Sequence, residues 1–333
     1  MMENVLDGIE DKIRAINFTG TYGESSLHPK FFEFLHMIAK AVPHKVKLMM
    51  ETNGATHNAE WWDEFGRIVK EHFKSDSFVV FALDGIDNET HQKYRRGLSF
   101  EKIIENATAF GAHSKVIWQM IEFEHNAHQF EEAKAMAESF GWEFKKRRSR
   151  LRFVSVKNGE VLQEKQTYQP TETKRKRYSK DSVAVANKDK EIAKQVHQKV
   201  SGSYQDTTEI VCEWAKRNQV SVDYDGMVWQ CCYFSTFNHP VVEFPTMNDM
   251  TPDQRIMEVQ RKERLDWYDN QYEFDWNNLN EYTLKEILNH RFFTHDLPKS
   301  FEGTTKDEEY PRIQRCSKFC GAASREIESK IND

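Results

Sequence analysis

Residues 16–32, INFTGTYGESSLHPKFF, contain the turn on which the fold assignment depends. A short apolar stretch runs into Thr-Gly-Thr-Tyr-Gly-Glu, and a helical pattern begins beyond Pro29, a residue favoured in the first turn of a helix. Glycine allows the backbone to approach a ligand closely, and an acid beside it can hold an amino group. Taken alone, Gly20, Gly23 and Glu24 fit a purely structural turn equally well, so the flanking sequence has to decide.

Strand-like and helix-like segments alternate from this turn to about residue 145. The patterns predict strands at 13–19, 46–51, 77–83, 115–123 and 142–146, and helices at 31–41, 60–73, 100–110 and 130–140. This order is typical of an α/β fold with a parallel sheet, in which ligands bind at the carboxyl ends of the strands. The polar residues expected at that rim are Asn53, Asp84, His91, Arg95, Glu122 and Asn126.

The ordered set of segments resembles the radical S-adenosylmethionine (SAM) superfamily. INFTGTYGESSLHP is followed by METNGA at 50–55, by VVFALDGIDNETHQKYRRG at 79–97 and by VIWQMIEFEHNAHQFEEAKAMAESFG at 116–141, in the family's order and at its spacing. The resemblance covers about residues 13–145. It implies a partial (β/α)6 TIM-like barrel that lacks its first β–α unit.

The resemblance also implies a set of cofactor-binding residues. The segment of Gly23 and Glu24 would contact the amino group of the methionine part of SAM, and Arg95 would lie near its carboxylate. The full implied set is Gly20, Gly23, Glu24, Asn53, Asp84 and Arg95. Asp84 and Glu122 are also candidate catalytic acids that could orient a substrate or take a proton. Two departures stand out: Ser25 replaces a proline, and Ala82 replaces a serine that often contacts the ribose.

All five cysteines lie in the last third of the chain: Cys212, Cys231, Cys232, Cys316 and Cys320. Four thiolates from two separate segments can close a zinc site or an iron–sulfur site, and ligand type alone does not choose between them. A hairpin around Gly226 would present Cys231, while strand alternation would point Cys232 the other way, as a spare thiol or an alternative ligand.

The pattern C-x13-G-x4-C, followed by C-x3-C, resembles the auxiliary-cluster domain called SPASM, or its shorter form, twitch. This resemblance implies one auxiliary [4Fe–4S] cluster on Cys212, Cys231, Cys316 and Cys320, in a small Cys-rich α+β C-terminal domain. The implied domains are a barrel at 1–150, a polar linker at 151–210 and the iron–sulfur domain at 211–333.

The three cysteines that hold the catalytic cluster in this family, C-x3-C-x2-C, are not found in the sequence. The opening stretch corresponds to the second strand of the family, so the first strand and its cysteine loop are expected upstream of Met1. As it stands, the chain is not expected to cleave SAM by itself. The alternatives are a longer gene product, a separate chain that supplies the loop, or a degenerate relative without catalytic activity.

The composition limits the compartment and the partners. A net charge of −6, with both signs mixed along the chain, gives no electrostatic case for nucleic-acid binding. No apolar run approaches a membrane span, and the first residues lack the apolar core of a signal peptide. A cytoplasmic protein is therefore expected.

The function expected from the resemblance is modification of a peptide or protein by hydrogen abstraction, with SAM as the source of the radical. The expected partners are the peptide or protein substrate, a chain that could supply the cluster loop, and a reductase or ferredoxin as electron donor. Two alternatives stay open: a non-catalytic binding module, and a zinc-stabilised α/β protein with unrelated chemistry.

Overall fold

The computed structural model describes residues 2–20, 23–123, 125–148, 155–157, 160–162, 209–232, 272, 275–304, 309, 310, 312, 313, 316, 317, 320 and 321. The chain divides into two compact units. One is Glu10–Lys190, and the other combines Met1–Ile9 with Glu191–Asp333.

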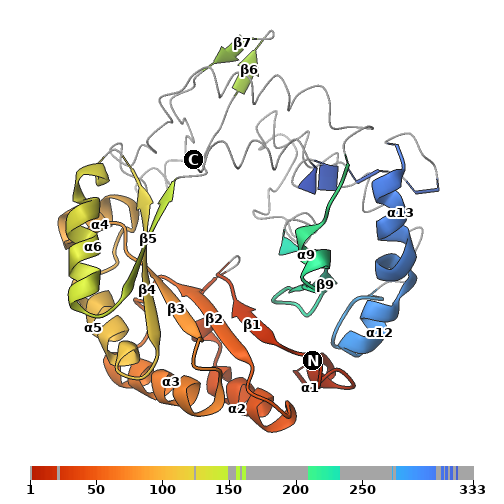
Figure 1. Ribbon diagram of the computed structural model, residues 1–333, viewed down its shortest axis with the longest axis horizontal. Helices are drawn as coiled ribbons and strands as arrows, with labels where there is room; N and C mark the ends of the chain where they lie inside the picture. The colour runs from red at the N-terminus through yellow and green to blue at the C-terminus, as the bar shows by residue number, and fades with distance from the viewer. Residues whose placement is uncertain are drawn as a thin grey trace, which may run out of the picture. The chain divides into compact units, whose positions relative to one another are not determined.

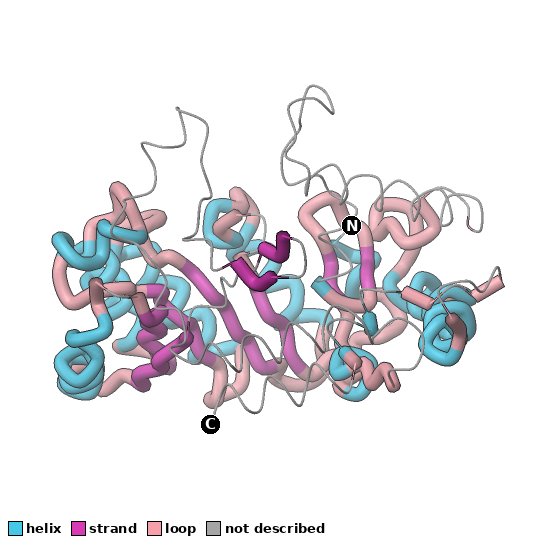
Figure 2. The backbone as a smooth tube through the Cα atoms, turned by 90° about the horizontal axis from the view of Figure 1, so that it is seen from above, coloured by secondary structure: helices cyan, strands magenta, loops and turns pink. Residues whose placement is uncertain are grey.

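The Glu10–Lys190 unit is built on a five-stranded parallel sheet whose strands are neighbours in sequence order (Figures 1 and 2). The strands are β1 (Ala15–Phe18), β2 (Lys47–Thr52), β3 (Phe78–Ala82), β4 (Lys115–Glu122) and β5 (Glu143–Arg148). The α-helices between them are α2 (Phe31–Ala41), α3 (Ala59–His72), α4 (Asn88–Tyr94), α5 (Phe100–Gly111) and α6 (Phe130–Ser139).

Right-handed crossovers between neighbouring parallel strands place every helix on the same face of a sheet. Figure 1 shows α2, α3, α5 and α6 along one face of this sheet. Helices on one face, with strands in sequence order, are the arrangement of a (β/α) barrel segment rather than of a doubly wound sheet. The predicted α/β fold and partial barrel are confirmed.

The core of this unit lies between the sheet and its helices. Trp62, Phe65, Phe81, Phe110 and Trp118 are completely buried there. Three helices begin at side-chain caps, because Asn58, Asp87 and Ser99 accept hydrogen bonds from the first-turn backbone N–H groups of α3, α4 and α5. The core and the caps together fix the carboxyl ends of the strands.

The second unit contains short elements. They are α9 (Glu213–Lys216), β8 (Ser221–Val222), β9 (Val228–Trp229), α12 (Leu284–Asn289), a π-helical turn (Phe292–Asp296) and α13 (Leu297–Glu302). β8 and β9 pair antiparallel around Gly226, which has φ 90°. The predicted hairpin is confirmed. β9 ends at Trp229, so strand alternation does not extend to Cys232, and the expected direction of that side chain has no basis.

The first helix, α1 (Met2–Leu6), packs on this second unit. Val5 and Ile9 contact a buried cluster formed by Val228, Leu279, Leu284 and Ile287. Asn4 Nδ2 donates a hydrogen bond of 2.8 Å to the carbonyl of Leu279. The N-terminal segment is therefore part of the core that lies behind the hairpin.

Val5→Asp is expected to destabilise this second unit by about 2 kcal/mol, because a carboxylate would enter an apolar cluster without a partner. Hydrogen exchange of the α12 amides measures the effect, and these amides should exchange faster in the variant. Glu3→Gln, at an exposed position of the same helix, is the matched control. Equal exchange in both variants would contradict the packing of α1.

The polar linker predicted for 151–210 lies outside the described residues, apart from a small hairpin of β6 (Ser155–Lys157) and β7 (Glu160–Leu162) and residues 209 and 210. The boundaries predicted at 150 and 210 remain predictions. Over the described part of the chain, no helix is both long enough and apolar enough to cross a membrane.

Candidate functional site

The Glu24 carboxylate is bound to the end of β2. Its Oε2 accepts a hydrogen bond from Thr52 Oγ1 at 2.7 Å, and its Oε1 accepts one from the backbone N–H of Asn53 at 2.8 Å. The predicted residues Glu24 and Asn53, which are far apart in the sequence, therefore lie together. Glu24 begins a short 3₁₀ turn, Ser25–Leu27, that connects the glycine turn to α2.

The same turn is also attached to the loop after β2. Ser26 Oγ and Thr56 Oγ1 are 2.7 Å apart, and His57 Nε2 lies 2.8 Å from the carbonyl oxygen of Ser26. Gly20 and Gly23 fit this close packing. A Cβ on Gly20 would lie 3.2 Å from the Gly23 carbonyl oxygen, and Gly23 has φ 151°. The glycines are thus needed for the backbone geometry of this turn.

Asp84 follows β3 and is completely buried. Its Oδ2 accepts from Arg95 Nε at 2.6 Å, and its Oδ1 accepts from the backbone N–H of Ile121 at 2.6 Å. Burial raises the pKa of this carboxyl above its ordinary value, and the Arg95 guanidinium and the Ile121 N–H oppose that rise. The predicted Asp84 and Arg95 are brought together, and the acid connects three elements: the end of β3, α4 and β4.

Asn126, one of the polar residues expected at the rim, reinforces this junction. Its Nδ2 donates to the carbonyls of Asp84 and Ile121, at 3.1 and 2.9 Å, and its Oδ1 accepts from the Phe123 N–H at 2.8 Å. No capping hydrogen bond from its side chain to the following turn is found. Asn126 therefore closes the loop between β4 and α6 against Asp84.

His91 is the third polar residue buried in this junction. Its Nδ1 accepts from the backbone N–H of Asp84 at 3.1 Å, and among the described residues its Nε2 has no hydrogen-bond partner. Burial, together with the nearby Arg95 charge, lowers the pKa of His91 to about 4. The imidazole is therefore neutral near pH 7 and serves as an acceptor for the backbone.

Because the pKa of His91 is lower in the folded chain than in the unfolded chain, only the unfolded chain binds the extra proton between about pH 6.5 and 4. The unfolding free energy should fall across this window as the pH decreases. His91→Asn, which keeps an acceptor, should reduce that fall by about 3 kcal/mol. Urea denaturation at several pH values measures the difference, and parallel curves for the two proteins would contradict it.

Glu122, the second candidate acid, is in a different environment at the end of β4. It forms an ion pair of 2.8 Å with Lys146 of β5, and its side chain is 21% exposed. Unlike Asp84, it can be reached from solvent.

Cys212 and Cys320 lie side by side in the second unit. Residues Ile210 and Gly321 form a β-bridge, and the backbone N–H of Val211 donates to the carbonyl of Cys320 at 3.1 Å. A hydrogen bond from the Cys320 thiol lowers the pKa of Cys212 to about 6, helped by backbone N–H groups at the start of α9. The same bond, burial, and the charges of Cys212, Cys316 and Cys231 raise the pKa of Cys320.

Cys231 and Cys316 meet in one apolar cluster with Trp229, Tyr272, Phe292 and Leu297. The four predicted ligand cysteines therefore lie in the second unit as two pairs, Cys212 beside Cys320 and Cys231 in one cluster with Cys316, and the described cysteines form no disulfide. As they are placed, however, no group of three or more His, Cys, Asp or Glu side chains in the described ranges could hold a metal ion. The assignment of these four cysteines as cluster ligands stays a prediction.

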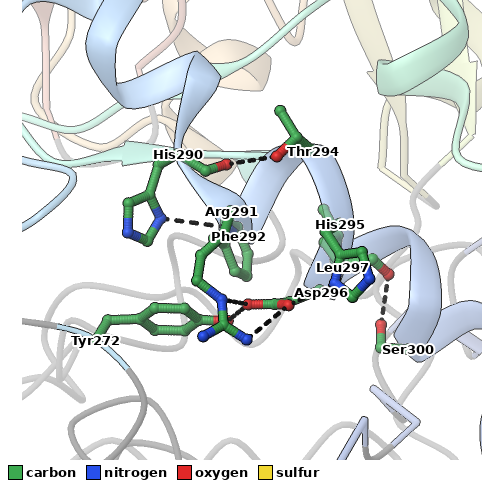
Figure 3. A network of polar contacts seen from close by, with 9 residues as sticks. All are labelled: Tyr272, His290, Arg291, Phe292, Thr294, His295, Asp296, Leu297 and Ser300. Carbon is green, nitrogen blue, oxygen red and sulfur yellow. Dashed lines mark hydrogen bonds and ion pairs between the residues drawn. The ribbon is translucent and has the colours of Figure 1, made fainter.

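A polar network that the sequence did not indicate lies beside this cluster (Figure 3). Asp296, buried at the end of the π-helical turn, accepts from Tyr272 Oη at 2.6 Å, from Arg291 Nε at 2.9 Å and from His295 Nδ1 at 2.9 Å. Burial alone would raise the pKa of Asp296, but its bonds to Arg291, Tyr272 and His295 lower it below the ordinary value. The network attaches the π-helical turn to Tyr272, a member of the cluster that contains Cys231.

Comparisons with known proteins give two family matches. Residues 2–134 match the family model described as the radical SAM superfamily, and residues 212–321 match the SPASM model, described as an iron–sulfur cluster-binding domain. No curated protein matches significantly.

Two solved structures illustrate the similarity. Native anSMEcpe with bound AdoMet is 14% identical, with a TM-score of 0.45, over 99% of this chain and 88% of that one. Streptococcus suis SuiB bound to S-adenosylmethionine is 12% identical, with a TM-score of 0.44, over 78% of this chain and 57% of that one.

Proposed function

Since this chain is a radical SAM superfamily protein with a C-terminal SPASM iron–sulfur cluster-binding domain, we propose that it takes part in the modification of a peptide or protein side chain by hydrogen abstraction. The two domains imply SAM and iron–sulfur clusters as cofactors. Two observations carry the proposal, one in each unit: Glu24 is bound to the end of β2 beside Asn53, and in the second unit Cys212 is hydrogen-bonded to Cys320.

The residues around Glu24 fit the amino end of SAM. An ionised carboxylate offers about four acceptor positions, and the hydrogen bonds from Thr52 and Asn53 use two of them. The remaining positions can accept from an ammonium group. Gly20 and Gly23 would let the ligand approach the backbone, as glycines do at ligand-binding turns.

Arg95 is proposed to bind the carboxylate of SAM. Its Nε is fixed by Asp84, and a guanidinium still offers its terminal amino groups for a carboxylate. Asp84 itself is proposed to orient this arginine and not to take a proton from substrate, because its carboxylate is completely buried. Glu122, which solvent can reach, is the better candidate for a proton acceptor. Asn53 would line the nucleoside side.

Cys212, Cys231, Cys316 and Cys320 are proposed to hold one auxiliary [4Fe–4S] cluster, since four thiolates are a ligand set that such clusters use. SAM bound at a reduced cluster would supply the radical chemistry for hydrogen abstraction. The chain has five cysteines and none before Cys212. We therefore propose that the cysteines of a catalytic cluster come from sequence outside these 333 residues.

A reductase or ferredoxin is proposed as the electron donor. The described cysteines form no disulfide, which is compatible with a reducing compartment, so a cytoplasmic location is proposed.

The proposal is tested by deuterium transfer. Protein reconstituted together with the sequence that carries the proposed catalytic-cluster cysteines would be incubated, without oxygen, with SAM, a reductant and either the peptide fraction or the small-molecule fraction of cells grown in deuterated medium. Deuterium is expected in 5′-deoxyadenosine with the peptide fraction, and much less of it with the Glu24→Gln chain. Transfer only from a small-molecule fraction would contradict a peptide substrate, and no transfer from any fraction would favour a non-catalytic binding module.

A further inference from the structure

Thr52 connects Glu24 to the interior of the protein. Its side chain is buried, with 4% of the residue exposed. Oγ1 lies 2.7 Å from Glu24 Oε2 and 2.9 Å from the backbone nitrogen of Gly54. A backbone N–H can only donate, so the hydroxyl accepts from Gly54 and gives its own proton to Glu24.

Gly54 has no acceptable replacement at this position. Its φ is 70°, and a Cβ would lie 2.6 Å from the Phe81 ring and 2.9 Å from Ile103. Its carbonyl accepts a hydrogen bond of 2.8 Å from Asn106 Nδ2 of α5. The peptide groups around Gly54 are therefore fixed by packing on one side and by Asn106 on the other.

Asn106 is completely buried, and within the described part of the chain its Oδ1 has no hydrogen-bond partner. A buried amide oxygen without a partner is costly. The hydrogen bond from Nδ2 to the Gly54 carbonyl is thus what holds the Asn106 side chain in place. The amide orientation is also settled, because only the NH₂ group can donate to a carbonyl.

These contacts form a continuous chain of hydrogen bonds from α5 to the rim: Asn106 to Gly54, Gly54 to Thr52, and Thr52 to Glu24. A free glutamate side chain samples many rotamers, and ordering it costs free energy when a ligand binds. We propose that Thr52 and Asn106 are positioning residues that hold the Glu24 carboxylate in place to receive the ammonium group of SAM. This inference rests on the proposed function, in which Glu24 contacts that group.

The test measures affinity for two ligands by equilibrium dialysis with the reconstituted full chain. One ligand is SAM, and the other is the SAM analogue in which hydrogen replaces the α-amino group. The affinity for SAM divided by the affinity for the analogue gives a ratio that reports the ammonium contact alone. This ratio does not respond to a general loss of stability. Thr52→Val keeps the side-chain shape and removes the hydroxyl. It should lower the ratio about tenfold, the size of effect expected for a lost hydrogen bond to a charged group.

The other variants make the test specific. Thr52→Ser restores the hydroxyl and should restore the ratio. Asn106→Leu should lower the ratio less than Thr52→Val does, because it acts through Gly54. Thr90→Val is the matched control: Thr90 is buried to a similar degree, with 6% exposed, but its hydroxyl accepts from Gln129 and does not contact Glu24. This control should leave the ratio unchanged.

Glu24→Gln separates the proposed contact between Glu24 and the SAM ammonium group from the proposed positioning role of Thr52 and Asn106. A lower ratio in Glu24→Gln with an unchanged ratio in Thr52→Val would overturn the positioning role and leave the SAM site standing. An equal loss of affinity for both ligands in Thr52→Val would also overturn it, because the residue would then be merely structural. An unchanged ratio in Glu24→Gln would reject the contact between Glu24 and the ammonium group. The positioning role of Thr52 and Asn106 depends on that contact and would be rejected with it.

Discussion

Cys320→Ala is expected to destabilise the auxiliary cluster. The Cys320 thiol is hydrogen-bonded to Cys212, and the charges of Cys231 and Cys316 act on it, so the substitution removes one of the four proposed ligands. Because three cysteines can still hold a cluster, iron and sulfide content after anaerobic reconstitution should fall well below about four of each per chain, the content expected for the unmodified chain. Because metal binding contributes directly to folding free energy, the second unit should also unfold more easily.

Cys232→Ala is the control for this experiment. Cys232 directly follows the proposed ligand Cys231 but is not itself in the proposed ligand set. Its replacement should leave iron and sulfide unchanged. Loss of the cluster in Cys232→Ala but not in Cys320→Ala would contradict the proposed ligand set.

Asp84→Ala is expected to cost about 3–5 kcal/mol of unfolding free energy, because it leaves the Arg95 guanidinium without its anion and the Ile121 N–H without its acceptor. Urea denaturation of the full chain, followed by tryptophan fluorescence, measures the loss. The large effect follows from the complete burial of Asp84, and it would be absent if the carboxylate were a free acid at the rim.

Asp63→Ala is the matched control in the same unit. Asp63 also pairs with an arginine, Arg67, and with His113, but its side chain is 39% exposed. Exposed ion pairs contribute little, so the loss should be much smaller. Equal losses in the two variants would show that Asp84 has no special role at the junction of β3, α4 and β4.

The parallel sheet could be predicted from the sequence because its evidence is local. Apolar runs and helical spacing placed all five strands within about two residues of their observed ends, and α2 has the predicted bounds, Phe31–Ala41. The hairpin at Gly226 was predictable for the same reason, since a glycine between two short β-rich stretches is a turn signal.

Contacts between distant residues could not be predicted in this way. Nothing in residues 2–6 indicates that α1 packs beside Leu279 and Leu284, 275 or more positions away. The Asp296 carboxylate at the end of the π-helical turn likewise accepts a hydrogen bond from Tyr272, 24 residues earlier in the chain. Such pairs depend on tertiary packing, which overrides local propensity.

The site was predictable in part. The family pattern indicated Glu24, Asn53, Asp84 and Arg95, and the structure brings Glu24 to Asn53 and Asp84 to Arg95. His91 was expected at the rim from its place after the third strand, but the sequence gave no indication that Asp84 would be buried or that Thr52 and Asn106 would support the rim. The arginine eleven residues after Asp84 was an available signal for an ion pair, whereas the bond from Asn106 to Gly54 spans 52 residues and has no local signal.

Metal analysis of the unmodified chain tests the central claim most directly. After anaerobic reconstitution with iron and sulfide, the protein should hold about four iron and four sulfide per chain, as one [4Fe–4S] cluster does, with little zinc. About one zinc per chain, with neither iron nor sulfide retained, would contradict the iron–sulfur assignment and favour a zinc-stabilised protein.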